Sequence, residues 1–222
     1  MKIICVYPIE DDKSTDFLEP IYKMLKKIPD INFVEYRLQN ENDTDEMIQD
    51  ISAKDESLII YMGHGSSLDL QQNYKPILKR DSLIILKGKR VFFLSCRSAE
   101  LLKKCGVPMK EYIGFGDMLT SWQEIMAERN LDANAYKGIT EEHIELFNSI
   151  LTNSVCQSLA KTIEQKKSFQ YLFLKIKIYL NREITRLLLD KQVVGYEILV
   201  ERLFDLKYNL SLSDKLEIEP LY

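Results

Sequence analysis

The stretch L-I-I-Y-M-G-H-G-S-S, residues 58–67, decides how this chain is expected to fold. Its first five residues form an apolar run, which is typical of a parallel strand that is covered on both faces. The run ends at a histidine between two glycines, Gly63 and Gly65. His64 is one of only two histidines in the chain, so its position at the end of a buried strand suggests a chemical role.

Similar strand patterns lie on both sides of this stretch, and helical patterns separate them. Strands are expected at residues 2–7, 31–38, 90–95 and 112–115, and helices at residues 17–28, 44–53 and 98–104. Residues 14–16 are expected to cap the first of these helices. Strands that alternate with helices predict an α/β fold, with a doubly wound, mostly parallel sheet flanked by helices.

The strand signal disappears beyond about residue 119, and helical periodicity replaces it. Helices are expected from Thr140, over 169–189 and over 193–206. The chain is therefore expected to comprise an α/β domain, residues 1–135, and a C-terminal helical extension, residues 136–222, that packs on it. The helix at 169–189 is apolar around much of its circumference, so it is either sandwiched in the domain or offered to a partner.

Composition narrows the possible functions. A net charge of −4 and a pI near 5.4 give no general attraction for nucleic acid or for anionic membranes. No segment approaches the ~20 apolar residues that cross a bilayer, and the N-terminal residues lack the apolar stretch of a signal peptide. The four cysteines contain no C-x-x-C pair. We therefore expect a cytoplasmic protein without a metal or a cofactor.

A histidine and a cysteine follow two strands of the same kind. His64 comes after the strand at 58–62, and Cys96 follows the strand at 90–95. Ligands of doubly wound sheets bind beyond the carboxyl ends of the strands, so both side chains are expected at one edge. There an imidazole can take the proton of a thiol and return it to a leaving amine. The remaining cysteines, Cys5, Cys105 and Cys156, are expected to be packing residues, and His143 to be exposed on a helix.

Backbone groups near this pair could stabilise negative charge. Gly65 has no side chain to obstruct a substrate, so its amide and the amide of Cys96 are the candidate oxyanion hole. The stretch at 98–104 reads as a helix, whose first amides would favour the thiolate of Cys96.

Two segments resemble the motifs of the caspase-like cysteine peptidases, which include caspases, metacaspases, gingipains, separase and the CHAT-domain proteases. They are I-I-Y-M-G-H-G-S-S, residues 59–67, and V-F-F-L-S-C-R-S-A, residues 91–99. The segment G-V-P-M-K-E-Y-I-G-F, residues 106–115, looks like the next strand of CHAT proteins, and the resemblance covers about residues 1–165. It implies a caspase-like fold with His64 as general base and acid, Cys96 as nucleophile and Gly65 as an oxyanion donor.

The same resemblance suggests substrate-binding residues. In these peptidases the segment after the strand at 112–115 often lines the substrate cleft, which points to Asp117 and Trp122, while Ser66 lies beside the histidine. A carboxylate at Asp117 would favour a basic substrate side chain. The chain departs from metacaspases at Leu94, where they carry a polar residue that recognises substrate, and its His–Cys spacing of 32 is shorter than the ~50 of caspases.

The expected function is that of a cysteine endopeptidase that cleaves a protein substrate under the control of a regulatory protein partner. Analogy with CHAT proteases suggests a role in bacterial antiviral defence. The alternatives are a catalytically inactive caspase-like scaffold that binds a partner, and a flavodoxin-like domain that binds a small ligand. A tyrosine phosphatase would need arginine at Leu102, and a dinucleotide site would need glycines in place of the acidic residues 10–12.

Overall fold

The first strand, β1 (Lys2–Val6), has apolar side chains on both faces, and this explains the three layers of the molecule. In the computed structural model, which describes residues 2–39, 41–53 and 56–213, Ile3 and Cys5 belong to one apolar core. Ile4 and Val6 belong to a second core on the opposite face. Because successive side chains of a strand alternate between faces, one continuous apolar run supplies both cores.

Six strands form the central sheet, in the order β2-β1-β3-β7-β8-β9. Five of them pair in parallel: β1, β2 (Asn32–Tyr36), β3 (Ser57–Met62), β7 (Arg90–Leu94) and β8 (Glu111–Gly114). The structure thus confirms an α/β fold with a mostly parallel sheet flanked by helices, and each of the strands expected from the sequence is present.

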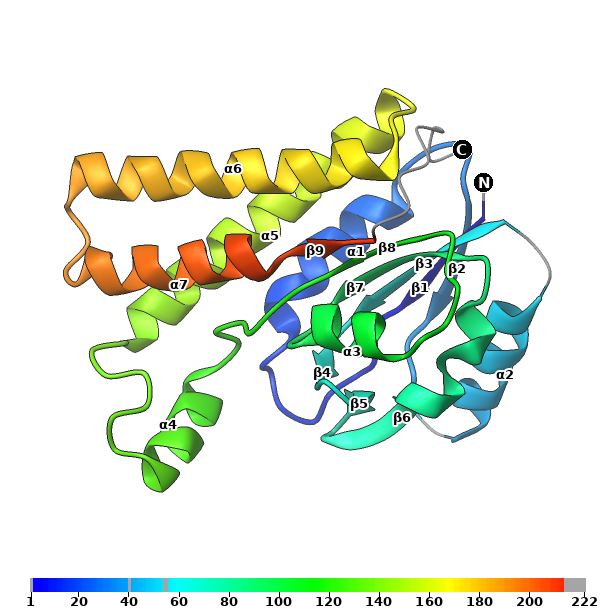
Figure 1. Cartoon of the computed structure of the whole chain (residues 1–222), viewed down its shortest axis with the longest axis horizontal. Helices are drawn as coiled ribbons and strands as arrows, with labels where there is room; N and C mark the ends of the chain where they lie inside the picture. The colour runs from blue at the N-terminus through cyan, green and yellow to red at the C-terminus, as the bar shows by residue number, and fades with distance from the viewer. Residues whose placement is uncertain (1, 40, 54–55, 214–222) are drawn as a thin grey trace.

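Helices cover both faces of the sheet, as Figure 1 shows. The α1 helix (Glu19–Lys26) follows a short 3-10 helix, η1 (Asp16–Leu18), and packs on the face to which Ile3 and Cys5 belong. On the other face lie α2 (Glu41–Ser52), α3 (Ser98–Lys104) and a 3-10 helix, η2 (Arg80–Leu86). None of the helices in the described part of the chain has both the length and the apolar character to cross a membrane.

A small antiparallel sheet begins at the histidine, in a segment where no strand was expected from the sequence. It contains β4 (His64–Gly65), β5 (Asp69–Gln72) and β6 (Lys75–Lys79). Asn73 and Tyr74, both with positive φ, make the two-residue turn between β5 and β6. Two-residue hairpin turns need such backbone angles, which asparagine tolerates well.

Within the described residues, four helices follow β8: α4 (Trp122–Leu131), α5 (Glu141–Glu164), α6 (Phe169–Asp190) and α7 (Tyr196–Asn209). Residues of α5, α6 and α7 share the core that contains Ile3 and Cys5. Figure 1 shows α6 and α7 side by side at the far end of the molecule, while α4 projects from its lower edge. The sequence pattern predicted α5, α6 and α7 but not α4.

The last strand of the sheet lies beyond residue 119, contrary to expectation. After α7, the short strand β9 (Ser211–Leu212) returns to the sheet and pairs antiparallel with β8, where Ser211 lies opposite Gly114. The backbone amide of Ser213 extends this contact by donating to the carbonyl of Tyr112 at 3.1 Å. Two residues are too few for a recognisable alternation of apolar and polar side chains, which is why β9 could not be predicted.

Two local expectations were wrong. His143 is buried, with 2% of its surface exposed, because its ring closes a capping box with Thr140 and contacts the carbonyl oxygen of Val194 through Nε2 at 2.7 Å. Residues 14–16 do not cap α1 with their side chains: Thr15 precedes η1 without a side-chain cap, and Ser14 takes part in the site described below.

Candidate active site

His64 and Cys96 leave the sheet at the same edge. Strands β3 and β7 are parallel neighbours in which Met62 lies opposite Leu94. His64 and Cys96 each come two residues later, and the amide of Gly63 still donates to the carbonyl of Leu94 at 3.3 Å. The pairing of the two strands therefore brings the imidazole and the thiol to one end of the sheet.

Gly65 lies directly against the segment that carries the cysteine. A Cβ atom at this position would be 2.7 Å from Oγ of Ser95 and 3.4 Å from the carbonyl oxygen of Cys96. Glycine is thus required here for close approach, since real Cβ atoms do not come so near to other heavy atoms. The oxyanion role of the Gly65 and Cys96 amides stays a prediction.

Three residues from two other loops hold one side of the imidazole. Ser14 Oγ is 2.7 Å from His64 Nε2, and the same hydroxyl donates a short hydrogen bond to Oδ1 of Asp12. Tyr74, in the β5–β6 turn, donates to Oδ2 of Asp12 at 2.7 Å and stacks on the imidazole with the ring centroids 4.7 Å apart. The loop after β1 and the β5–β6 hairpin therefore both contact the imidazole and hold it in place.

This arrangement fixes which nitrogen of His64 carries the proton. A serine hydroxyl has a single proton to donate, and Ser14 directs it to Asp12, so its oxygen accepts the proton on Nε2 of His64. In the neutral ring the lone pair then lies on Nδ1. Nδ1 is consequently the nitrogen that can act as a base.

A carboxyl group lies next to that nitrogen. Oε1 of Glu124, on α4, is 3.4 Å from Nδ1 of His64, and the hydroxyl of Thr120 donates a short hydrogen bond to Oε2 of the same carboxyl. Burial is the main cause that raises the pKa of Glu124 to about 7; the nearby charge of Asp12 contributes to the rise, and hydrogen bonds from Ser121 oppose it. Near neutral pH, Glu124 therefore exists in both its protonated and its ionised form.

The protonation state of the other groups follows from their surroundings. Burial lowers the pKa of His64, although Asp12 partly opposes this, so the imidazole is neutral above its ordinary pKa. Burial raises the pKa of Cys96 to about 12; Glu124 and Asp117 also raise it, while the hydrogen bond to Met118 lowers it. The resting site contains a thiol and a neutral imidazole rather than the expected thiolate.

The thiol of Cys96 borders a cavity of about 350 Å³. The half-buried side chain donates a weak hydrogen bond from Sγ to the carbonyl oxygen of Met118 at 3.7 Å. The residues that line the cavity come from the two strand ends, from the loop after β8, from α4 and from the loop after α4. They include Gly65, Cys96, Asp117, Glu124, Glu128 and Tyr136. The nucleophile candidate thus has room for a ligand beside it.

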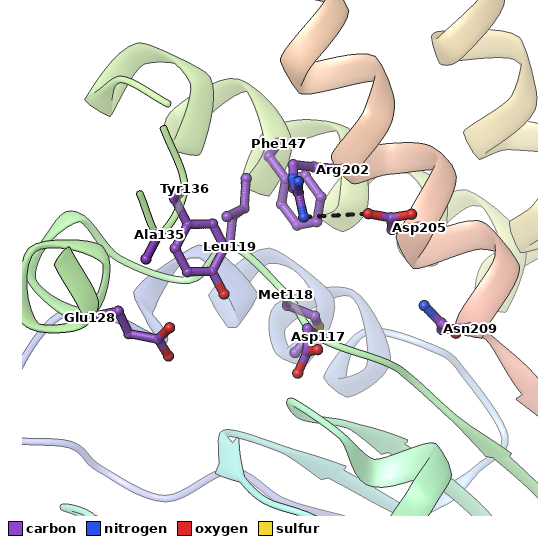
Figure 2. Close-up of a pocket in the computed structure, with 10 residues that line it drawn as sticks. All are labelled: Asp117, Met118, Leu119, Glu128, Ala135, Tyr136, Phe147, Arg202, Asp205 and Asn209. Carbon is purple, nitrogen blue, oxygen red and sulfur yellow. Dashed lines mark ion pairs between the residues drawn. The ribbon is translucent and has the colours of Figure 1, made fainter. Parts of the chain in front are cut away.

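A second cavity of about 300 Å³ adjoins the first, since both are lined by Asp117, Met118, Leu119, Glu128 and Tyr136. Figure 2 shows the second cavity, with Arg202 and Asp205 of α7 on its far wall. These two form an ion pair with 3.4 Å between Nη1 and Oδ2. Together the cavities run from Cys96 to the C-terminal helices.

The structure brings only one of the three predicted substrate-binding residues to these cavities. Asp117 lines both cavities, but it is largely exposed and lies 3.8 Å from Nε of Arg97. Ser66 donates to Asp69 at 2.7 Å in the β4–β5 turn. Trp122 begins α4 and stacks with Arg129, whose guanidinium carbon is 5.1 Å from the ring centroid. Neither Ser66 nor Trp122 is among the residues that line the two cavities.

The sequence reasoning missed Asp12, Ser14, Tyr74 and Glu124. A signal for Glu124 does exist, because Ser121 and Glu124 have the spacing of a capping box and would mark the start of α4. Oγ of Ser121 indeed accepts from the amide of Glu124 at 3.2 Å. The other three could not be found locally, since Ser14 and His64 are 50 positions apart.

Comparison with models of known protein families gives no match, and no curated protein matches the chain.

Proposed function

We propose that the chain is a cysteine endopeptidase in which His64 and Cys96 form the catalytic pair. The observation that carries this proposal is that both residues follow the ends of neighbouring parallel strands, at one edge of the sheet, where Cys96 lines a cavity. The resemblance of residues 59–67 and 91–99 to the motifs of caspase-like peptidases, closest to the CHAT-domain proteases, supports the same assignment.

In the proposed reaction, Sγ of Cys96 attacks a peptide carbonyl carbon while its proton passes to Nδ1 of His64. The amides of Gly65 and Cys96 stabilise the oxyanion. The C–N bond then breaks, His64 returns the proton to the leaving amine, and a thioester remains. Water attacks the thioester, gives a proton to His64 and releases the acid, and the proton returns to the thiol. Since the resting thiol is protonated, base catalysis by His64 is essential to the first step.

Control by a regulatory protein partner is part of this proposal, because an unrestrained protease would damage the cell that makes it. A surface for such a partner is available on α6 and α7, where several large apolar side chains are exposed. These are Leu174, Ile178, Leu188, Leu189, Phe204 and Tyr208. A cytoplasmic location and a role in bacterial antiviral defence extend the analogy with CHAT-domain proteases.

Thiol labelling tests the catalytic pair without knowledge of the substrate. Iodoacetamide is expected to alkylate Cys96 of the folded protein before Cys5, Cys105 or Cys156, and His64→Ala is expected to slow the labelling of Cys96 about tenfold. The physical reason is that the thiolate reacts, and with a thiol pKa of about 12 the thiolate needs a base beside it. Peptide mass spectrometry of the alkylated protein measures each site separately.

The matched control for this experiment is His143→Ala, which removes the other histidine and leaves the candidate site intact. It is expected to leave the labelling rate of Cys96 unchanged. Equal labelling of all accessible cysteines in the folded protein, with no effect of His64→Ala, would favour the alternative of a non-catalytic scaffold that binds a partner.

The proposed substrate carries a basic side chain next to the bond that is cut. Four carboxylates line the joined cavities, and three of them have partners: Asp117 with Arg97, Asp205 with Arg202, and Glu124 with His64 and Thr120. Glu128 has no ion-pair partner within the described residues, and it lines both cavities beside Tyr136. Figure 2 shows its carboxyl group turned toward the space below the Tyr136 ring.

Fluorogenic peptides test this preference. Peptides that end in Arg or Lys are expected to be cut at least tenfold faster than those that end in Asp or Leu, since a hydrogen bond to a charged group contributes about 1.5–3 kcal/mol. Glu128→Gln is expected to remove most of this difference, and Glu142→Gln, an exposed change on α5, to preserve it. If Leu-terminated peptides are cut as well as Arg-terminated ones, the basic preference is wrong and the catalytic pair is unaffected.

A further inference from the structure

We infer that Glu124 is a positioning residue of the proposed reaction, whose ionised carboxylate supports the imidazolium that His64 forms when it takes the proton of Cys96. This inference rests on the proposed function, because it gives a role to a group that acts through His64.

The carboxyl group of Glu124 lies beside Nδ1, the nitrogen of His64 that can act as a base. The Ser14–Asp12 hydrogen bond leaves the lone pair of His64 on Nδ1, and the Glu124 carboxyl is the group 3.4 Å from that atom. Glu124 also lines the cavity that Cys96 borders. Any proton that moves from the thiol to Nδ1 therefore arrives beside this carboxyl.

The two forms of Glu124 act on this step in opposite ways. A protonated carboxyl is a donor that competes with the thiol for the Nδ1 lone pair, and it offers no charge to an imidazolium. An ionised carboxylate leaves the lone pair available, and it stabilises the imidazolium because an opposite charge a few ångströms away favours the charged form. Both effects make the ionised form the active one.

Other charged and titratable groups surround this carboxyl. They are Asp12 and Tyr74 on the other side of His64, Cys96 across the cavity, and Glu128 one turn later on α4. Asp12 is held ionised: burial would raise its pKa, but hydrogen bonds from Ser14 and Tyr74 outweigh burial and lower it. Burial raises the pKa of Tyr74, so this phenol stays neutral. Glu124, with a pKa of about 7, changes charge near neutral pH, whereas burial lowers the pKa of His64 below its ordinary value.

The test is the pH profile of Cys96 alkylation by iodoacetamide. In the unchanged protein the rate is expected to rise through a step near pH 7. In Glu124→Gln this step is expected to disappear, so that only a step at lower pH, from the titration of His64, remains. The rate at pH 8 is expected to fall about tenfold. Glu124→Asp keeps the charge on a shorter side chain and is expected to restore the step in part. Glu142→Gln serves as the acidic control outside the site.

Thermal unfolding supplies a readout that does not depend on reactivity. A carboxyl whose pKa is raised on folding makes the folded state progressively less stable as pH rises from the unfolded-state pKa to the raised pKa. Glu124→Gln is therefore expected to unfold at a higher temperature than the unchanged protein at pH 8. This difference is expected to shrink as pH falls from 7 and to vanish below about 4, where the carboxyl is protonated in both states.

The outcomes separate this inference from the proposed function. If Glu124→Gln labels as fast as the unchanged protein at pH 8, or faster, the repulsion between Glu124 and the thiolate dominates and the inferred role is overturned. If His64→Ala slows labelling in that same experiment, the catalytic pair stands without Glu124. If His64→Ala has no effect either, the proposed function fails together with it.

Discussion

Replacing Cys96 by alanine is expected to abolish peptide cleavage, with a loss of at least about a thousandfold. Removal of the nucleophile of a covalent mechanism leaves only the contribution of substrate binding and of the oxyanion donors. The measurement compares new protein N-termini, identified by mass spectrometry, in cells that express either the unchanged protein or Cys96→Ala together with its genomic neighbours. Cleavage products that appear only with the unchanged protein would identify the substrate and the bond that is cut.

The matched control for this prediction is Cys105→Ala. Cys105 ends α3, and its thiol donates to the carbonyl of Leu102 at 3.1 Å on the core side away from the cavities. The change is expected to leave all cleavage products in place. Persistence of the same products with Cys96→Ala would show that another group is the nucleophile and would refute the assignment.

Replacing Arg90 by methionine is expected to lower the free energy of unfolding by about 3–5 kcal/mol. Arg90 begins β7, and its Nε lies 2.9 Å from Oε2 of Glu111 at the start of β8; both side chains are buried. Removing one member of a buried ion pair takes an oppositely charged neighbour away from the other charge in the interior, and this costs about that much. Urea-induced unfolding measures the change.

Two further variants separate the buried charge from simple loss of packing. The double change Arg90→Met with Glu111→Leu is expected to recover most of the lost stability, since it removes both charges. Arg186→Gln breaks an exposed pair on α6, in which Nε of Arg186 is 2.8 Å from Glu183, and is expected to cost less than about 1 kcal/mol. A double variant as unstable as the single one would contradict the electrostatic explanation.

The parallel strands could be predicted because burial on both faces leaves a mark in each short segment. Residues 58–62 and 91–94 are apolar throughout, and both lie inside the sheet with helices on either side. The α4 helix left no such mark, since Ile125 is its only buried residue and its amphipathicity is weak. The β5–β6 hairpin depends on backbone angles at Asn73 and Tyr74, which side-chain patterns indicate poorly.

The residues of the candidate site likewise differ in whether a local sequence pattern indicates them. His64 and Cys96 could be predicted because each ends its own strand, so one local rule applies to both. The partners of His64 come from three separate places: the loop after β1, the hairpin turn and the start of α4. No periodicity relates these positions to one another, because only the tertiary fold brings them together.

Because the chain returns to the sheet at β9, the part of the chain that carries His64 and Cys96 cannot be separated from the C-terminal helices without loss of sheet pairing. In the sequence, the helices from α4 to α7 lie between β8 and β9, which are adjacent strands of the sheet. Cys96 follows β7, which pairs with β8 on its other side. Truncation of the chain near residue 135 would remove the strand that pairs with β8 and would expose the apolar core that α5 covers. Only one residue, Leu210, separates α7 from β9. A movement of α7 would therefore be transmitted to the sheet whose strand β7 precedes Cys96.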